Sequence, residues 1–200
     1  MGDVLELLVH LDHDAIRASA DLRWGPATAV FALVSAWWVK GPLLVALGCC
    51  ADLGNRRLYP LVALAATLSF LVATGLNALI KPLVDRDRPP EAIGLDALVG
   101  VPASASFPSG HAMTAFATAG AVAVLAPRLR WPVLALAGAI AVSRVYLGVH
   151  FWLDVLAGAA LGLTIGALAA VALRPLLCRV PVWRGWPRLL PGRGPDAPRA

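Results

Sequence analysis

Three ionisable side chains, Arg144, His150 and Asp154, lie within the otherwise apolar stretch SRVYLGVHFWLD at residues 143–154. His150 and Asp154 are four residues apart, so a helical backbone would place them on one face, one turn apart. The carboxylate would then hold the imidazole in one tautomer and stabilise its cation, as in catalytic triads. The alternative is a local His–Asp pair that serves packing alone.

A second polar cluster, KPLVDRDRP at residues 81–89, contains Lys81 and Arg88. Basic side chains bind phosphate oxygens, and arginine does so through two parallel hydrogen bonds. The alternative is that these side chains snorkel to a membrane interface while the neighbouring aspartates pair with them locally. Arg86, inside the cluster, receives no role from the sequence.

A third cluster, FPSGH at residues 107–111, has the composition of a helix start. Ser109 is a suitable N-cap, and Gly110 allows close backbone approach. The N–H groups at a helix N-terminus bind phosphate well. A plain capped helix carrying an interfacial histidine, His111, is the alternative.

The elements that position these clusters are those of a membrane protein. Of the 200 residues, 59% are hydrophobic and only 14% are charged, whereas a soluble domain has about a quarter charged residues. Residues 58–80 and 155–173 carry no charge, and about 20 apolar residues cross a bilayer as a helix. The sequence therefore predicts an all-α, polytopic transmembrane helical bundle.

The bundle is expected to have five to six spans. Four are expected over residues 58–80, 108–127, 131–149 and 151–173, and the apolar segment 27–53, interrupted by Lys40-Gly41-Pro42, forms one bent span or two shorter elements. Three parts of the chain are expected: an N-terminal interfacial helix (1–24), a transmembrane domain (25–174), and a basic, disordered cytoplasmic tail (175–200).

The distribution of arginine predicts the orientation. Cytoplasmic loops are enriched in basic residues, and the candidates here are Arg56, Arg57, Arg128, Arg130 and six arginines after residue 173. Alternation of the spans then brings residues 81–107 and 144–151 together on the extracytoplasmic face. The net charge of +5 does not indicate a nucleic-acid partner, because six of the 17 basic residues lie after residue 173, where membrane topology explains them.

Taken together, the clusters predict phosphoryl transfer without a metal or another cofactor. Cations and backbone donors neutralise the oxygens of a transferring phosphoryl group. One histidine can attack phosphorus while the other protonates the leaving oxygen. The acidic residues, histidines and three cysteines show no spacing typical of a metal site.

The three clusters resemble the signature of the type 2 phosphatidic acid phosphatase superfamily, which also contains vanadium haloperoxidases. That signature is Lys-x6-Arg-Pro, then Pro-Ser-Gly-His, then Ser-Arg-x5-His-x3-Asp, and each part is present between Lys81 and Asp154. The resemblance implies six membrane helices, His150 as the nucleophile that forms a phosphohistidine, Asp154 as its orienting group and His111 as the general acid. It also implies that the phosphate is held by Lys81, Arg88, Ser109, Gly110 and Arg144.

The function predicted first is an integral membrane lipid phosphatase acting on undecaprenyl or another polyprenyl pyrophosphate at the extracytoplasmic face of the cell membrane. A phosphatidylglycerophosphate or phosphatidic acid phosphatase is the alternative within the same class. A transporter or channel would carry its charges in mid-span, whereas these clusters lie at span ends. A haloperoxidase is disfavoured by the apolar composition and the small size. Lipid phosphate and membrane lipids are the expected partners.

Overall fold

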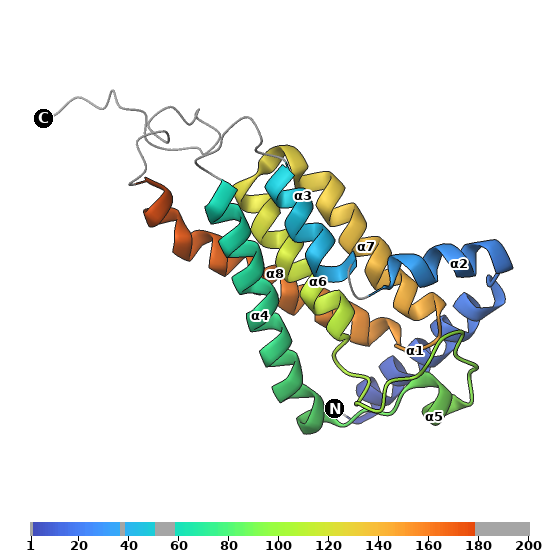
Figure 1. Cartoon of the computed structure of the whole chain (residues 1–200). Coiled ribbons are helices and arrows are strands. Elements are labelled where there is room, and N and C mark those ends of the chain that lie inside the picture. The colour runs from blue at the N-terminus through green and yellow to red at the C-terminus, as the bar shows by residue number, and fades with distance from the viewer. Residues whose placement is uncertain (1, 37–38, 51–58, 179–200) are drawn as a thin grey trace, which may run out of the picture.

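The computed structural model describes residues 2–36, 39–50 and 59–178, which form helices joined by loops without a strand among them. In chain order these are α1 (Gly2–Asp21), α2 (Gly25–Val34), a π-helical turn (Val39–Leu43), α3 (Leu44–Cys50), α4 (Tyr59–Val84), α5 (Pro89–Ile93), α6 (Gly110–Leu125), a 3-10 turn (Pro127–Leu129), α7 (Arg130–Tyr146) and α8 (Trp152–Cys178). The predicted all-helical class is confirmed (Figure 1).

Helix α6 is the centre of the bundle. Helices α3, α4, α7 and α8 pack around it (Figure 1), and twelve of its sixteen residues are buried. A helix that is apolar on all sides is typically an internal one. Most of the buried residues are alanine, glycine or threonine, and small side chains allow neighbouring helices in a membrane to approach closely.

Three glycines on α8 form its contact with α6. A Cβ added to Gly158 would lie 2.7 Å from the carbonyl oxygen of Ser109, and one added to Gly162 or Gly166 would collide with backbone atoms of α6. The glycines are spaced four residues apart, so they lie on one side of α8 and admit the α6 backbone along two turns. This contact fixes the position of α8 along α6.

Several helices meet the requirements for crossing a bilayer. The segments Val62–Ile93, Pro127–Tyr146 and Trp152–Leu173 are long and apolar enough to do so. Helix α6, with 16 residues, is about 24 Å long and is enclosed by the others. Large apolar side chains on α4 and α8 point outward, among them Leu64, Leu68, Leu71, Leu156 and Leu168. Lipid is the solvent that suits such faces.

The apolar segment predicted over 27–53 forms two short helices, which is one of the two arrangements expected. Helix α2 ends at Val34, and a π-helical turn containing Pro42 leads into α3. Proline lacks the N–H that continues an α-helical ladder, which explains the irregular turn. Helix α2 packs on α7, whereas α3 packs on α4 and α6.

Helix α4 continues beyond its predicted end at residue 80 to Val84, so Lys81 lies in its last turn. Asp85 then adopts a left-handed conformation with φ 44°, which aspartate tolerates better than most residues, and this turns the chain back toward the bundle. Arg88 is the N-cap of the short helix α5, with Pro89 at its first position.

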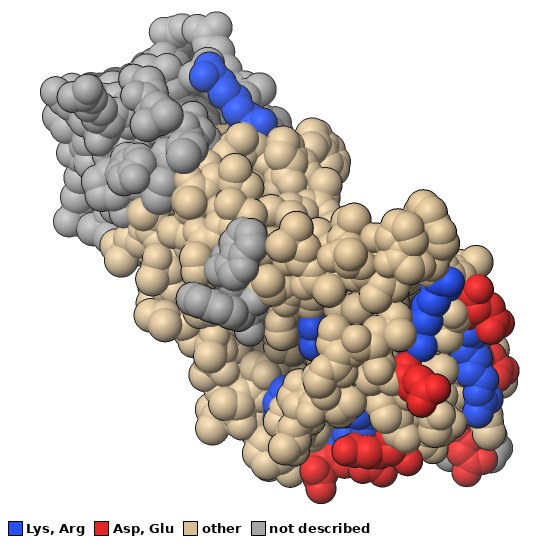
Figure 2. Space-filling model, turned by 45° about the vertical axis from the view of Figure 1, so that its right-hand side comes forward, with Lys and Arg blue, Asp and Glu red and all other residues tan. Residues whose placement is uncertain are grey.

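Charged side chains gather at the end of the bundle that carries α1 and α5. The exposed acidic residues of the described chain are Glu6, Asp14 and Asp21 in α1 and Asp85, Asp87, Glu91 and Asp96 after α4. Figure 2 shows them at the lower end, whereas the middle of that face is almost free of charge. The three motif clusters meet at this polar end.

Candidate active site

A pocket of about 220 Å³ lies at the polar end, between α4, the start of α6 and the turn from α7 to α8. Six of the eight predicted site residues line it: Lys81, Arg88, Gly110, His111, Arg144 and His150. The other two, Ser109 and Asp154, are fully buried. Pockets for drug-sized ligands have about 300–1,000 Å³, so this one suits a phosphorylated head group better than a whole lipid.

The His150–Asp154 pair is formed, although not by the helical spacing predicted. Helix α8 begins at Trp152, so His150 precedes it, in a turn that Gly148 makes possible with φ 76°. Asp154 Oδ2 lies 3.5 Å from His150 Nδ1 and accepts a hydrogen bond of 3.0 Å from the backbone N–H of Phe151. Asp154 thus satisfies an N–H at the helix start that has no intrahelical acceptor.

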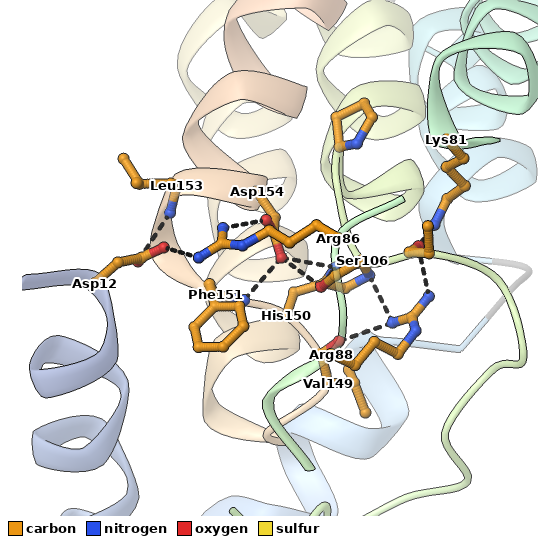
Figure 3. A network of polar contacts seen from close by, with 12 residues as sticks. Asp12, Lys81, Arg86, Arg88, Ser106, Val149, His150, Phe151, Leu153 and Asp154 are labelled. Carbon is orange, nitrogen blue, oxygen red and sulfur yellow. Dashed lines mark hydrogen bonds and ion pairs between the residues drawn. The ribbon is translucent and has the colours of Figure 1, made fainter. Parts of the chain in front are cut away.

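Two residues that the sequence did not reveal hold the Asp154 carboxylate in place (Figure 3). Ser106 Oγ donates to Oδ2 at 2.5 Å and lies 3.4 Å from His150 Nδ1. Arg86 Nη1 pairs with Oδ1 at 2.6 Å. Both carboxylate oxygens are therefore engaged, and the orientation of Asp154 is fixed from two sides.

Arg88 lies on the opposite side of the imidazole. Its Nη1 is 3.3 Å from His150 Nε2 and donates to the carbonyl oxygen of Val149 at 2.7 Å, while its Nε donates to the carbonyl oxygen of Ser104 at 2.8 Å. These backbone acceptors hold the guanidinium in a buried position. With Nδ1 toward Asp154 and Nε2 toward Arg88, the imidazole directs Nε2 to the cationic side of the site (Figure 3).

The surroundings of His150 favour its neutral form. Burial, above all, lowers its pKa, the hydrogen bond to Asp154 raises it, and the nearby cations Arg88 and Arg144 lower it further. The result is a pKa of about 4. At neutral pH the imidazole therefore carries the free electron pair that a nucleophile needs.

The remaining two cations are held by neighbouring loops and helix ends. Lys81 Nζ donates to the carbonyl oxygen of Ala105 and, at 3.3 Å, to Ser104 Oγ. Arg144 Nη1 donates to the hydroxyl of Ser35, the C-cap of α2. The Nε of Arg144 is buried and has no hydrogen-bond partner among the described residues.

The start of α6 differs from the predicted cap in one respect. Ser109 is the N-cap residue, but its hydroxyl makes no capping hydrogen bond and has no partner within the described part of the chain. Its backbone N–H instead donates to the carbonyl oxygen of Asp154 at 3.0 Å, which joins α6 to α8. A Cβ at Gly110 would lie 2.9 Å from Asn77 Oδ1, so the group that approaches this glycine is a side-chain amide, whereas the sequence predicted close approach of a backbone.

The polar groups converging on the pocket suit a tetrahedral anion. Three cationic side chains, Lys81, Arg88 and Arg144, line it together with His111 in the first turn of α6. The positive end of the α6 dipole points the same way. A phosphoryl group would supply acceptors for the Ser109 hydroxyl and the Arg144 Nε, whose burial without a partner is otherwise unfavourable.

The sequence profile of the PAP2 superfamily matches residues 62–176, a range that includes all three motif clusters. The chain belongs to the PAP2 superfamily. The resemblance inferred from the motifs is thus confirmed, and the protein is a multi-pass membrane phosphatase of this family.

PAP2 relatives agree in fold and in sequence. The crystal structure of a transmembrane PAP2 type phosphatidylglycerolphosphate phosphatase from Bacillus subtilis superposes with a TM-score of 0.70 at 27% identity, covering 87% of this chain and 89% of that one. Decaprenylphosphoryl-5-phosphoribose phosphatase of Mycobacterium tuberculosis is 42% identical over 129 residues, which are 64% of this chain and 69% of the relative. Undecaprenyl-diphosphatase of Sulfolobus acidocaldarius is 33% identical over 111 residues, 54% and 53% of the two chains.

Arg86 and Ser106 are the site residues that sequence reasoning missed. Arg86 stands inside a recognised cluster, two residues before Arg88, so its charge was visible but its partner was not. Ser106 directly precedes the FPSGH cluster and carries no signal of its own. The contacts of both with Asp154 span more than 45 positions of sequence, and no local pattern encodes such a contact.

Proposed function

We propose that this PAP2 protein is a metal-independent lipid phosphatase that forms a phosphohistidine on His150. The supporting observation is the orientation of the imidazole, with Nδ1 3.5 Å from Asp154 Oδ2 and Nε2 facing Arg88 and the pocket. Asp154 fixes the tautomer with the proton on Nδ1, which leaves the electron pair on Nε2 for attack.

The reaction proceeds in two displacements. His150 Nε2 attacks phosphorus, a P–N bond forms, and the bond to the leaving oxygen breaks while His111 gives that oxygen a proton. In the second step His111 takes a proton from water, whose oxygen attacks phosphorus and breaks the P–N bond. Inorganic phosphate then leaves. Lys81, Arg88 and Arg144, together with the Ser109 hydroxyl and the Gly110 N–H, hold the non-bridging oxygens throughout.

The proposed substrate is a polyprenyl-linked phosphate. The pocket has room for a head group, and the apolar outer faces of α4 and α8 offer a surface for a long chain. Two relatives, named for decaprenylphosphoryl-5-phosphoribose and for undecaprenyl diphosphate, support a polyprenyl lipid. A phosphorylated sugar on a polyprenyl phosphate and a polyprenyl pyrophosphate each present a terminal phosphate to such a site.

An assay with purified protein tests both the chemistry and the substrate class. Phosphate release is measured in detergent with EDTA on four lipids: decaprenylphosphoryl-5-phosphoribose, undecaprenyl pyrophosphate, phosphatidylglycerophosphate and phosphatidic acid. We expect the largest kcat/KM for one of the two polyprenyl lipids, inhibition by vanadate, and a trapped phosphoenzyme that His150→Ala abolishes. A larger kcat/KM for a glycerophospholipid would overturn the substrate class, and chelation that stops activity until magnesium is restored would overturn the chemistry.

We further propose that the site faces away from the cytoplasm. Arg128 lies in the 3-10 turn after α6, and Arg130 is the first residue of α7. Both therefore follow the far end of α6, whereas the pocket lies at its start, and basic residues favour the cytoplasmic side. Of the other arginines used in the prediction, Arg174 lies in the last turns of α8, whereas Arg56, Arg57 and the five beyond residue 178 lie outside the described residues. A lipid phosphate displayed on the outer leaflet would be within reach of such a site.

Cysteine labelling tests the orientation. In a variant without Cys49, Cys50 and Cys178, single cysteines replace Ala103, in the loop at the site, or Leu129, between α6 and α7. An impermeant maleimide applied to intact cells should label position 103 and reach position 129 only after the membrane is opened. The reverse pattern would refute the proposed orientation.

Helix α1 is proposed to lie in the membrane interface, as a separate part before the transmembrane domain. Its exposed apolar residues Val4, Leu7, Leu8 and Leu11 recur every three or four positions, so they form one stripe. Asp12 and Ile16, on another side of the helix, are buried against the bundle. A stripe of this kind suits the boundary between head groups and acyl chains. The proposed basic tail begins within α8, and residues 179–200 lie outside the described residues.

A further inference from the structure

Asp12, in the middle of α1, is buried at the polar end of the bundle, with 1% of its side chain exposed. Its Oδ1 accepts a hydrogen bond of 3.1 Å from the backbone N–H of Leu153, in the first turn of α8. Its Oδ2 pairs with Arg86 Nη2 at 2.8 Å. A carboxylate from the N-terminal helix therefore reaches both the helix that carries Asp154 and the guanidinium that binds Asp154 (Figure 3).

Arg86 joins the two carboxylates. One terminal nitrogen binds Asp12 and the other binds Asp154 Oδ1 at 2.6 Å, which is the forked geometry that arginine provides and lysine does not. The guanidinium also lies 4.2 Å from the ring centroid of Phe151, and His13 of α1 stacks on the same ring at 5.0 Å. Phe151 directly follows His150, so these contacts also restrain the backbone of the nucleophile.

The sum of charges explains why two carboxylates are needed. Asp12, Arg86 and Asp154 together carry a net charge of −1, and this charge stabilises the imidazolium that forms when His150 is phosphorylated. With Asp12 neutral, Arg86 would cancel the charge of Asp154. The pocket would then contain only the cations Lys81, Arg88 and Arg144 opposite the nucleophile, and a positive charge on the imidazole would be disfavoured.

We infer that Asp12 and Arg86 are positioning residues for the His150–Asp154 pair, and that α1 is consequently part of the catalytic unit. The inference rests on the proposed role of His150. Asp12 fixes Arg86 and balances its charge, and Arg86 in turn fixes Asp154 Oδ1, while neither residue touches the phosphoryl group. The groups that set the charge around His150 are Asp154 in α8, Arg88 before α5 and Arg144 in α7. The groups around Arg86 are Asp154 in α8 together with Asp12 and His13 in α1.

The test compares Asp12→Asn with Asp14→Asn in the full-length protein. The substituted asparagine keeps the size of the Asp12 side chain but has one acceptor oxygen for two donors, whereas Asp14 is exposed and pairs with the exposed Arg17 at the surface. We expect Asp12→Asn to lower kcat about tenfold, the effect of weakening one charge-assisted hydrogen bond, with KM little changed. The acid limb of the kcat/KM profile should move to lower pH. Asp14→Asn should change neither value.

The double variant Asp12→Asn with Arg86→Gln distinguishes charge balance from simple structural support. Removing one negative and one positive charge restores the net −1, so the acid limb should return to its wild-type position even though two contacts are lost. If the limb does not move in Asp12→Asn, or moves further in the double variant, the inference is wrong. Should Asp12→Asn fail to fold, Arg86→Lys takes its place, since lysine keeps the charge but reaches one carboxylate only. It should then lower kcat without moving the limb, and unchanged kcat would overturn the inference.

Failure of the proposed function has a different signature. If His150→Ala still forms a phosphoenzyme and releases phosphate, His150 is not the nucleophile, whatever Asp12→Asn does. If His150→Ala is inactive and Asp12→Asn behaves as wild type, the phosphatase mechanism stands and only the role of α1 is refuted.

Discussion

Replacing Asp154 by asparagine removes one charge from the centre of the site with almost no change in volume. Asp154 is fully buried and accepts from Arg86, Ser106, Phe151 and His150. The asparagine amide has one oxygen, so its NH2 group must face either the Arg86 guanidinium or the side shared by the serine, the backbone N–H and the imidazole. In either orientation the NH2 group faces another hydrogen-bond donor, so at least one of these hydrogen bonds is lost. The tautomer of His150 is then no longer fixed.

The distance to the imidazole sets the size of the effect. At 3.5 Å, a full negative charge stabilises an imidazolium by about 4.7 kcal/mol with an effective dielectric constant of about 20. Arg86, which is 2.6 Å from the other carboxylate oxygen, offsets part of this, and we expect a net loss of about 3 kcal/mol. That corresponds to a fall in kcat of between about 100- and 200-fold.

The assay is single-turnover formation of the phosphoenzyme from radiolabelled substrate, together with steady-state phosphate release. Asp87→Asn is the matched control, because Asp87 is an exposed carboxylate that directly precedes Arg88 and forms no ion pair among the described residues. Circular dichroism and thermal unfolding in detergent monitor folding of both variants. A correctly folded Asp154→Asn protein with kcat within tenfold of wild type would refute the argument that this carboxylate stabilises the phosphorylated imidazole.

Three further outcomes are expected. Burial depresses the pKa of His150 to about 4, so its reactive neutral form persists below pH 6.5 and is lost only as the pH falls through about 4. The kcat/KM profiles of two substrates with different phosphate pKa values should therefore share an acid limb near pH 4. A shared limb at or above pH 6.5 would contradict this. Ser106→Ala removes the 2.5 Å bond to Asp154 and should lower kcat about tenfold with KM preserved, measured by phosphate release; an unchanged kcat would assign the serine no part in orienting the pair. Gly162→Ala places a methyl group against the α6 backbone and should lower both the melting temperature and kcat, whereas Gly138→Ala, which meets no atom within 4 Å, should lower neither.

The sequence predicts most of what local patterns can encode. The ends of α6, α7 and α8 lie within a few residues of the predicted spans, because long apolar runs bounded by polar motifs define them. The three clusters come together as expected, with the backbone N–H of Ser109 donating to the carbonyl oxygen of Asp154 and the Arg88 guanidinium donating to that of Val149. Family motifs and span alternation were sufficient for that part of the site.

Long-range contacts are the part that the sequence could not predict. The hydrogen bond between Asp12 and the backbone N–H of Leu153 joins residues that are 141 positions apart in the sequence. The sequence of an amphipathic helix does not distinguish an aspartate that faces water from one that binds a buried arginine. The irregular backbone between α2 and α3 was recognisable from Lys40-Gly41-Pro42, but the packing of α2 on α7 depends on the shape of the finished bundle. The contact of Gly158, Gly162 and Gly166 with the α6 backbone was not predicted, because the spacing of glycines along one helix does not identify the helix that packs against them.

The site draws on the first helix, the middle loops and the last helix of the described chain, and this has a consequence for biosynthesis. When a growing chain has inserted α1 to α7, Arg86 has one of its two carboxylates, and the backbone N–H of Ser109 still lacks its acceptor in Asp154. Arrival of α8 supplies that acceptor, the second carboxylate and the fixed orientation of the His150 imidazole in one event. The site therefore takes its final arrangement only once α8 has packed against α6, and a chain that has inserted α1 to α7 alone does not yet contain it.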